Sequence, residues 1–146
     1  MKLTSIFENN GKIPGKYTCD GDNVNPPFFI KDISQETKSL VLIIDDPDAI
    51  KPAGKVWDHW VVINIPANTS EIRGDSVPGK ELINSSNNVS YHGPCPPDRE
   101  HRYFFKLYAL DIELKLDSNS NKKDVEREMQ GHILAKAELI GRYERS

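Results

Sequence analysis

Short apolar runs separated by polar turns dominate the hydrophobic pattern of this 146-residue chain. The clearest run, Leu40–Ile44, is too short for a helix and rich in branched side chains, which predicts an interior strand. A second run, Trp60–Ile65, predicts another strand. Residues 50–56 contain Lys51-Pro52-Ala53-Gly54 and predict the loop that joins the two strands.

The most regular alternation begins at His101. If residues 101–110 form a strand, every second side chain lies on one face. That face holds His101, Tyr103, Phe105, Leu107 and Ala109. The strand follows Gly93-Pro94-Cys95-Pro96-Pro97, a loop that its prolines make stiff. We therefore expect a small pocket with polar side chains at its rim at this end of the strand.

The other parts of the chain show different hydrophobic patterns. Residues 1–31 mix apolar clusters with turn signals, which predicts short strands, and the polar residues 66–90 predict a long surface excursion. A helix is expected from Lys122 to about Gln130, with Val125 and Met129 facing inward and Gly131 ending it. Beyond it, residues 133–140 alternate with a period of two, which predicts a last strand, although their good helix formers leave a continuing helix open.

Many short strands and one late helix predict a mainly β, mainly antiparallel fold. The length is that of a single domain over residues 1–146, and 37% hydrophobic and 28% charged residues are typical of a globular protein. The net charge of -3 and the scattered basic residues argue against a nucleic-acid partner. No apolar run approaches the ~20 residues of a transmembrane segment, and none resembles a signal peptide, so we expect a cytoplasmic protein.

The two cysteines, Cys19 and Cys95, are too few for a disulfide framework and fit a reducing compartment. We expect both to be thiols, with one disulfide between them as the alternative. Cys95 is expected to be a small packed residue rather than a nucleophile, because no base is placed near it by spacing.

Polar residues stand at the ends of the predicted strands. Asp46 and Asp48 flank Pro47 directly after the first strand, which by itself fits a turn, since Asp-Pro opens turns and Asp caps free N–H groups. His59 lies between two tryptophans before the second strand, and a packing role fits it as well as a functional one. Strand ends of this kind can converge into one site.

Four segments in one order resemble the phosphatidylethanolamine-binding protein (PEBP) family, and most of all its bacterial and archaeal branch, often called Raf-kinase-inhibitor-like. They are DPDA at 46–49, HWVVINIP at 59–66, GPCPP at 93–97 and HRY at 101–103. The likeness runs from the region of Pro14 to Tyr143. It implies an antiparallel β-sandwich with one or two short peripheral helices near the C-terminus, a shallow anion-binding pocket and no cofactor.

The resemblance also assigns residues. It implies a ligand-binding set of Asp46, His59, Gly93, Pro94, Pro96, His101 and Tyr103. It implies a supporting set of Asp48, Trp57, Pro97 and Arg102, in which Arg102 pairs with a carboxylate. Asp46 beside His59 or His101 would raise the pKa of that imidazole, so that a cationic ring faces a phosphate.

The expected function is binding of a phosphate-containing small ligand or a phospholipid head group. The resemblance adds docking on a protein kinase or serine protease, with inhibition of it, and a homodimer. No catalytic motif is present, so no enzyme is expected. Two alternatives stay open: a scaffold with a vestigial pocket, and a metal site or His/Asp hydrolase drawing on Asp46, His59, His92, Cys95 and His101.

The sequence departs from the family pattern at two places beside the expected pocket. Ile50 stands where the family usually has Pro, and the charged segment Asp98-Arg99-Glu100 stands where the family usually has Gly. These differences imply a pocket rim of different shape and charge.

Overall fold

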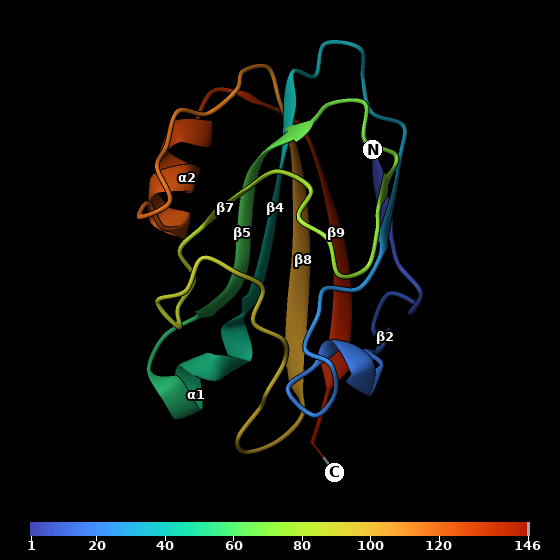
Figure 1. The fold of residues 1–146 in the computed structure, drawn as a ribbon, viewed down its shortest axis with the longest axis vertical. Helices are drawn as coiled ribbons and strands as arrows, with labels where there is room; N and C mark the ends of the chain where they lie inside the picture. Colours follow the sequence, from blue (N-terminus) through green and yellow to red (C-terminus); the bar gives the residue numbers. More distant parts are fainter. Residues whose placement is uncertain (146) are drawn as a thin grey trace.

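The computed structural model describes residues 1–145, which form two β-sheets and a few short helices (Figure 1). The strands are β1 Lys2–Thr4, β2 Gly11–Lys12, β3 Phe28–Lys31, β4 Ser39–Asp46, β5 Trp57–Pro66, β6 Glu71–Ile72, β7 Lys80–Leu82, β8 His101–Leu110 and β9 Ile133–Tyr143. The helices are α1 Ile50–Ala53 and α2 Lys122–Met129, with 3-10 turns η1 Gly15–Tyr17 and η2 Pro47–Ala49.

The large sheet has six strands in the order β2-β9-β8-β4-β5-β7, and the small sheet has the order β1-β3-β6. All pairs are antiparallel except β2 with β9. Figure 1 shows α2 on one side of the large sheet and the N-terminal strand β1, which belongs to the small sheet, on the other. The expected mainly antiparallel β-sandwich is confirmed. No helix within residues 1–145 is long and apolar enough to cross a membrane.

Strand β4 is buried along its whole length because both faces of the large sheet are covered. Leu40, Leu42 and Ile44 pack into the core between the two sheets. Val41 and Ile43 pack on the opposite face, in a second core that includes residues of α2. Coverage of both faces explains why this strand reads as a continuous apolar run rather than as an alternation.

The predicted helix and last strand are both confirmed. The side chain of Asn121 accepts a hydrogen bond from the Asp124 N–H and that of Asp124 accepts one from the Asn121 N–H, a capping box at the start of α2. Val125 and Met129 are buried. Gly131 follows with a φ of 80°, a conformation that glycine adopts without strain. The strand β9 then pairs with β8 over nearly its whole length, which decides against a continuing helix.

Two segments expected to be irregular contain regular structure. Residues 50–53 form α1, which ends at Gly54 with a φ of 81°, so one of the two short helices lies mid-chain rather than near the C-terminus. Within residues 66–90, β6 pairs with β3 and β7 pairs with β5. A chain that passes an open sheet edge satisfies its buried backbone groups by pairing there, and such short strands leave little periodicity in the sequence.

Candidate functional site: a pocket at the end of the central strands

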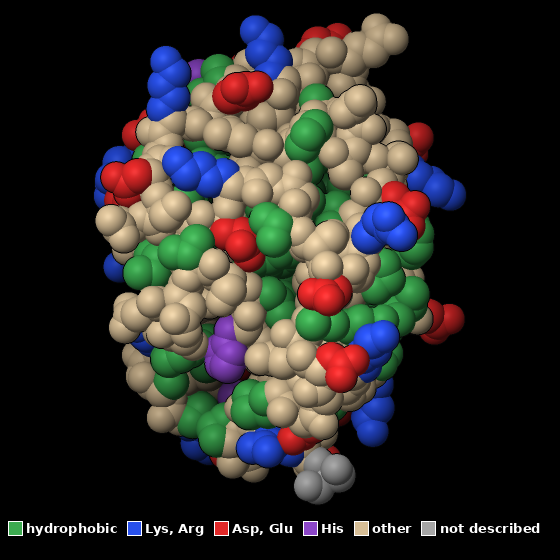
Figure 2. Space-filling model, viewed as in Figure 1, with side chains coloured by type: hydrophobic (Ala, Val, Ile, Leu, Met, Phe, Trp, Pro, Cys, Tyr) green, Lys and Arg blue, Asp and Glu red, His purple; other side chains and the backbone are tan. Residues whose placement is uncertain are grey.

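A cavity of about 200 Å³ lies at the end of β4, β5 and β8, next to α1. Figure 2 shows histidine atoms among hydrophobic ones in the lower part of the face in view. The lining residues come from two stretches that are far apart in the sequence, residues 46–59 and 92–103. They are Asp46, Ala49, Pro52, Ala53, Trp57, His59, His92, Cys95, Pro96, Pro97, His101 and Tyr103.

Asp46 links the turn after β4 to the pocket. Its Oδ1 accepts a hydrogen bond from the Asp48 N–H at 2.9 Å, and its Oδ2 lies 2.6 Å from Nδ1 of His101. Burial raises the pKa of the Asp46 carboxyl above its ordinary value, and the hydrogen bond from His101 opposes that rise. Asp46 therefore stabilises the turn and also lines the pocket, and its role in ligand binding stays a prediction.

His101 lies between two carboxylates. Its Nδ1 faces Asp46, and its Nε2 lies 2.7 Å from Oδ1 of Asp98, a residue of the charged segment before β8. The His101 side chain is only 1% exposed. A carboxylate only accepts hydrogen bonds, so the two contacts require either a doubly protonated ring or one protonated carboxyl group. Both ring nitrogens are occupied in either case.

His59 reaches the pocket through a β-bulge. Ile44 pairs with Trp60 and the next residue, Asp45, pairs with Asp58, so His59 is an extra residue in β5. The bulge interrupts the alternation that would place His59 and Trp60 on opposite faces. The His59 ring instead lies 5.3 Å from the ring of Tyr103, on the side of the core between the sheets.

Burial favours the neutral form of the His59 ring. Its Nδ1 hydrogen is donated to the backbone carbonyl of His92 at 2.5 Å, and burial lowers the pKa of the imidazole to about 4. The Nε2 atom then carries a lone pair. Of the two rings proposed for contact with Asp46, the structure places His101 beside it, while burial holds the pKa of His59 below neutral pH.

Tyr103 supplies a neutral hydroxyl to the pocket. Its side chain is buried, and burial raises its pKa far above the ordinary value, so the hydroxyl keeps its hydrogen. The ring lies edge-on to His59 and 6.4 Å from the ring of His101. Tyr103 can therefore act both as a wall and as a hydrogen-bond donor.

Asp48 and Arg102 form an ion pair beside the pocket. Nε of Arg102 lies 3.0 Å from Asp48 Oδ2 and its terminal nitrogen lies 2.9 Å from Oδ1, while the Arg102 N–H donates to Oδ2 at 2.8 Å. The expected pairing of Arg102 with a carboxylate is confirmed. The hydrogen bond from the Arg102 side chain lowers the pKa of the Asp48 carboxyl. The pair joins the turn after β4 to the first residues of β8.

The two halves of the proline loop, residues 93–94 and 96–97, make different contacts. Pro96 and Pro97 line the pocket, as does Trp57, whereas Gly93 and Pro94 do not. The Gly93 N–H donates to Asn23 at 2.8 Å, and the Pro94 carbonyl accepts from the Cys19 N–H at 3.1 Å. The first half of the loop thus contacts the N-terminal segment, and a ligand-binding role for Gly93 and Pro94 stays a prediction.

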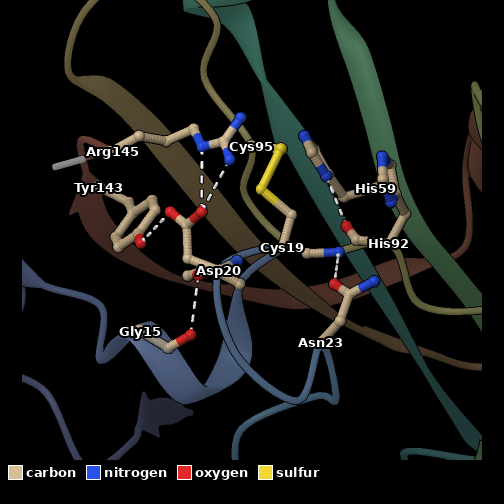
Figure 3. The surroundings of a disulfide bond; sticks show 11 residues. Gly15, Cys19, Asp20, Asn23, His59, His92, Cys95, Tyr143 and Arg145 are labelled. Atoms are coloured by element: carbon tan, nitrogen blue, oxygen red, sulfur yellow. Dashed lines mark hydrogen bonds and ion pairs between the residues drawn. A yellow bond between two sulfur atoms is a disulfide. The ribbon is translucent and has the colours of Figure 1, made fainter.

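The expectation of two free thiols is wrong, because Cys19 and Cys95 form a disulfide (Figure 3). The bond joins the pocket loop to the N-terminal segment across a sequence separation of 76 residues. Asp20, the next residue, accepts hydrogen bonds from Tyr143 and Arg145. Contacts at such separations leave no local signal in the sequence. The pairing removes the cysteine-based argument for a reducing compartment, and the cytoplasmic location stays a prediction.

Sequence reasoning missed the walls contributed by Pro52 and Ala53, because α1 was expected to be a loop, and the wall contributed by Ala49 at the end of η2. It also missed the role of Asp98, whose only signal was a charged residue three positions before His101. Within residues 1–145, no three His, Cys, Asp or Glu side chains are placed to hold a metal ion. The disulfide also takes Cys95 out of the suggested ligand set.

Comparison with known proteins gives one consistent result. The model of the family described as phosphatidylethanolamine-binding protein matches residues 4–144. The chain is 45% identical to the UPF0098 protein of Methanothermobacter thermautotrophicus over 97% of each sequence, and 47% identical to that of Aquifex aeolicus over 95% of this chain and 85% of the relative.

Solved structures agree. The crystal structure of a PEBP homolog, CT736 from Chlamydia trachomatis, has a TM-score of 0.93 at 39% identity, covering 99% of this chain and 97% of the other. The crystal structure of E. coli YbcL, described as a new member of the mammalian PEBP family, has a TM-score of 0.89 at 29% identity, covering 99% and 98%. The similarity therefore extends through the whole fold, including every segment that lines the pocket.

Proposed function

Because the chain belongs to the phosphatidylethanolamine-binding protein family, we propose that its pocket binds the phosphate group of a small ligand, either free phosphate or a phospholipid head group. The main support is the convergence of Asp46, His59, His101 and Tyr103 on one cavity from three different strands. Strands hold such groups more rigidly than loops do.

The chemistry of the lining supports a small polar ligand. The Tyr103 hydroxyl is a donor for a phosphate oxygen, and the Nε2 lone pair of His59 is an acceptor for a protonated phosphate oxygen. Apolar side chains, among them Trp57, Pro96 and Pro97, form much of the remaining wall. A mostly apolar cavity with a few convergent polar groups is typical of small-molecule sites.

None of the lining side chains is a Lys or an Arg. Arg102, the nearest candidate by sequence, is paired with Asp48. An anion would therefore be held by hydrogen bonds and by the His101 ring rather than by a fixed cation. We expect weak to moderate affinity, and binding rather than catalysis as the role of the pocket.

Calorimetric titration with inorganic phosphate and with phosphorylethanolamine tests the proposal. Tyr103→Phe removes one donor and should weaken binding about tenfold, the loss expected for one hydrogen bond to a charged group. Tyr108→Phe, on the same strand but in the core beside α2, should bind like the wild type. A wild-type protein that binds neither ligand, or a Tyr103→Phe variant that binds as well as the wild type, would contradict the proposal.

The other expectations stay predictions with their own measurements. Inhibition of a kinase or serine protease calls for enzyme assays, and the homodimer for light scattering. For the His/Asp hydrolase alternative, the Asp46–His101 contact is the feature to consider, but Nε2 of His101 faces Asp98 rather than a nucleophile. A protein interaction that survives the loss of phosphate binding would favour the scaffold alternative.

A further inference from the structure

We propose that Asp98 is a built-in competitor for the pocket, whose carboxylate occupies the position on His101 that a ligand phosphate takes when it binds. Asp98 would then set the affinity of the pocket for anions. The inference rests on the proposed function and adds to it a residue that determines affinity, located in the segment where this sequence departs from the family pattern.

Both nitrogens of the His101 ring contact carboxyl groups. An imidazole has two nitrogens, and Nδ1 is held by Asp46 at the buried side of the ring. Nε2 is the only atom through which His101 can donate a hydrogen bond to a ligand, and Oδ1 of Asp98 lies 2.7 Å from it. With the ring only 1% exposed, a phosphate oxygen gains this donor only if Asp98 leaves.

The charge around His101 also disfavours an incoming anion. Two carboxyl groups, Asp46 and Asp98, flank one imidazole. An incoming phosphate therefore meets a carboxylate at the His101 donor, and like charges at such distances repel. Removal of the Asp98 carboxylate would free the donor and eliminate this repulsion.

The surroundings of Asp98 leave room for its carboxylate to move away from His101. Asp98 lines a neighbouring cavity of about 400 Å³ rather than the pocket itself, and Pro96 and Pro97 line both cavities. Its Oδ2 already lies 3.7 Å from Nε of Arg99, and both side chains are partly exposed. Asp98 can rotate away from His101 toward Arg99 without disturbing the core.

Calorimetry with Asp98→Ala tests the inference, using inorganic phosphate and phosphorylethanolamine as separate ligands. We expect each to bind about tenfold more tightly than to the wild type, since a charge-assisted hydrogen bond no longer has to be broken. Equal gains for both ligands indicate that the phosphate group is what competes. A gain for phosphorylethanolamine alone would overturn the inference, because Asp98 would then affect the rest of the head group.

Asp111→Ala is the matched control. Asp111 also pairs with a histidine, since its Oδ1 lies 2.8 Å from Nδ1 of His132, but both side chains are about two-fifths exposed and neither lines the pocket. The substitution changes the net charge by the same amount and should leave phosphate affinity at the wild-type value. A gain equal to that of Asp98→Ala would show a general charge effect and overturn the inference.

The outcomes separate the inference from the proposed function. Phosphate binding of equal strength in the wild type and Asp98→Ala overturns the inference and leaves the function standing. Binding by Asp98→Ala with none detectable in the wild type supports the competitor role of Asp98 and contradicts the proposed function for the wild-type protein. Absence of binding in both overturns the function and the inference together. In the wild type, saturating phosphate should also move the carboxyl ¹³C resonance of Asp98, and an unchanged resonance counts against displacement.

Discussion

His59 donates its Nδ1 hydrogen to the carbonyl of His92, and the two rings stack with centroids 5.6 Å apart. The contact crosses from β5 to the loop before β8 and leaves His59 buried with no carboxylate in hydrogen-bond contact. The resulting low pKa of the His59 ring links the stability of the pocket to pH.

Acid should destabilise the protein through His59. The unfolded imidazole takes up a proton near pH 6.5, whereas the folded one does so near pH 4, because burial lowers its pKa. The neutral ring therefore contributes stability that is fully present above pH 6.5 and is lost as the pH falls toward 4. The shift corresponds to roughly 3 kcal/mol.

Urea unfolding at pH 7 and pH 4.5 measures this loss. His59→Gln should show a smaller fall in the free energy of unfolding between the two pH values than the wild type. His132→Gln, at an exposed histidine, should keep the wild-type fall. An identical fall in wild type and His59→Gln would contradict the assignment of a neutral buried His59.

Removal of the disulfide should lower stability substantially. Cys19 and Cys95 close a long loop, and cross-links of this length restrict the unfolded chain by about 4 kcal/mol in the chain-entropy model. Thermal unfolding with and without reductant measures the loss, and a Cys19→Ser/Cys95→Ser variant should melt like the reduced protein and be insensitive to reductant. Two reactive thiols in the denatured, unreduced protein would show that the bond does not form.

Arg102→Ala should loosen the junction between η2 and β8. Arg102 is about half exposed, so solvent screens its pairing with Asp48 and the loss should be only about 1 kcal/mol. A double-mutant cycle with Asp48→Ala measures the coupling of the two side chains in urea unfolding. Arg102→Lys should not restore it, because lysine lacks the two-pronged geometry of the guanidinium group. Full rescue by lysine would show that charge attraction alone accounts for the stabilising effect of the contact.

Gly93→Ala should be strongly destabilising. A Cβ at this position would lie 2.5 Å from both the Tyr17 carbonyl oxygen and Asn23 Oδ1, which forces the proline loop away from the N-terminal segment. We expect a loss of about 2 kcal/mol, typical of overpacking. Gly15→Ala is the control, since its Cβ would meet only the Tyr143 hydroxyl at 3.9 Å. Equal melting temperatures for the two variants would contradict the predicted clash.

Periodicity predicts the local elements well. The alternation from His101 predicts β8 and the face that Tyr103 and Phe105 share, and both are buried in the core between the sheets. The 3.6-residue spacing of Val125 and Met129 likewise predicts the inward face of α2. These elements depend on which side chains face a core, and the order of apolar residues records that directly.

The shortest helices and strands could not be predicted from the sequence pattern. The helix α1 and the strands β6 and β7 comprise four, two and three residues, fewer than a periodic pattern needs. The two strands form because their backbone groups meet β3 and β5 in the folded chain. The alanine and proline walls that α1 adds to the pocket were missed for the same reason.

The sequence by itself determined the fold class, the main strands and helix, and the residue types that gather at the strand ends, because hydrophobic order and motif order are local properties of a chain. Only the tertiary structure decided that Asp46 and Asp98 hold His101, that a bulge turns His59 into the pocket, and that Cys19 meets Cys95. These relationships depend on distances between strands and loops, and bringing distant segments together is the work of packing, which no local pattern encodes.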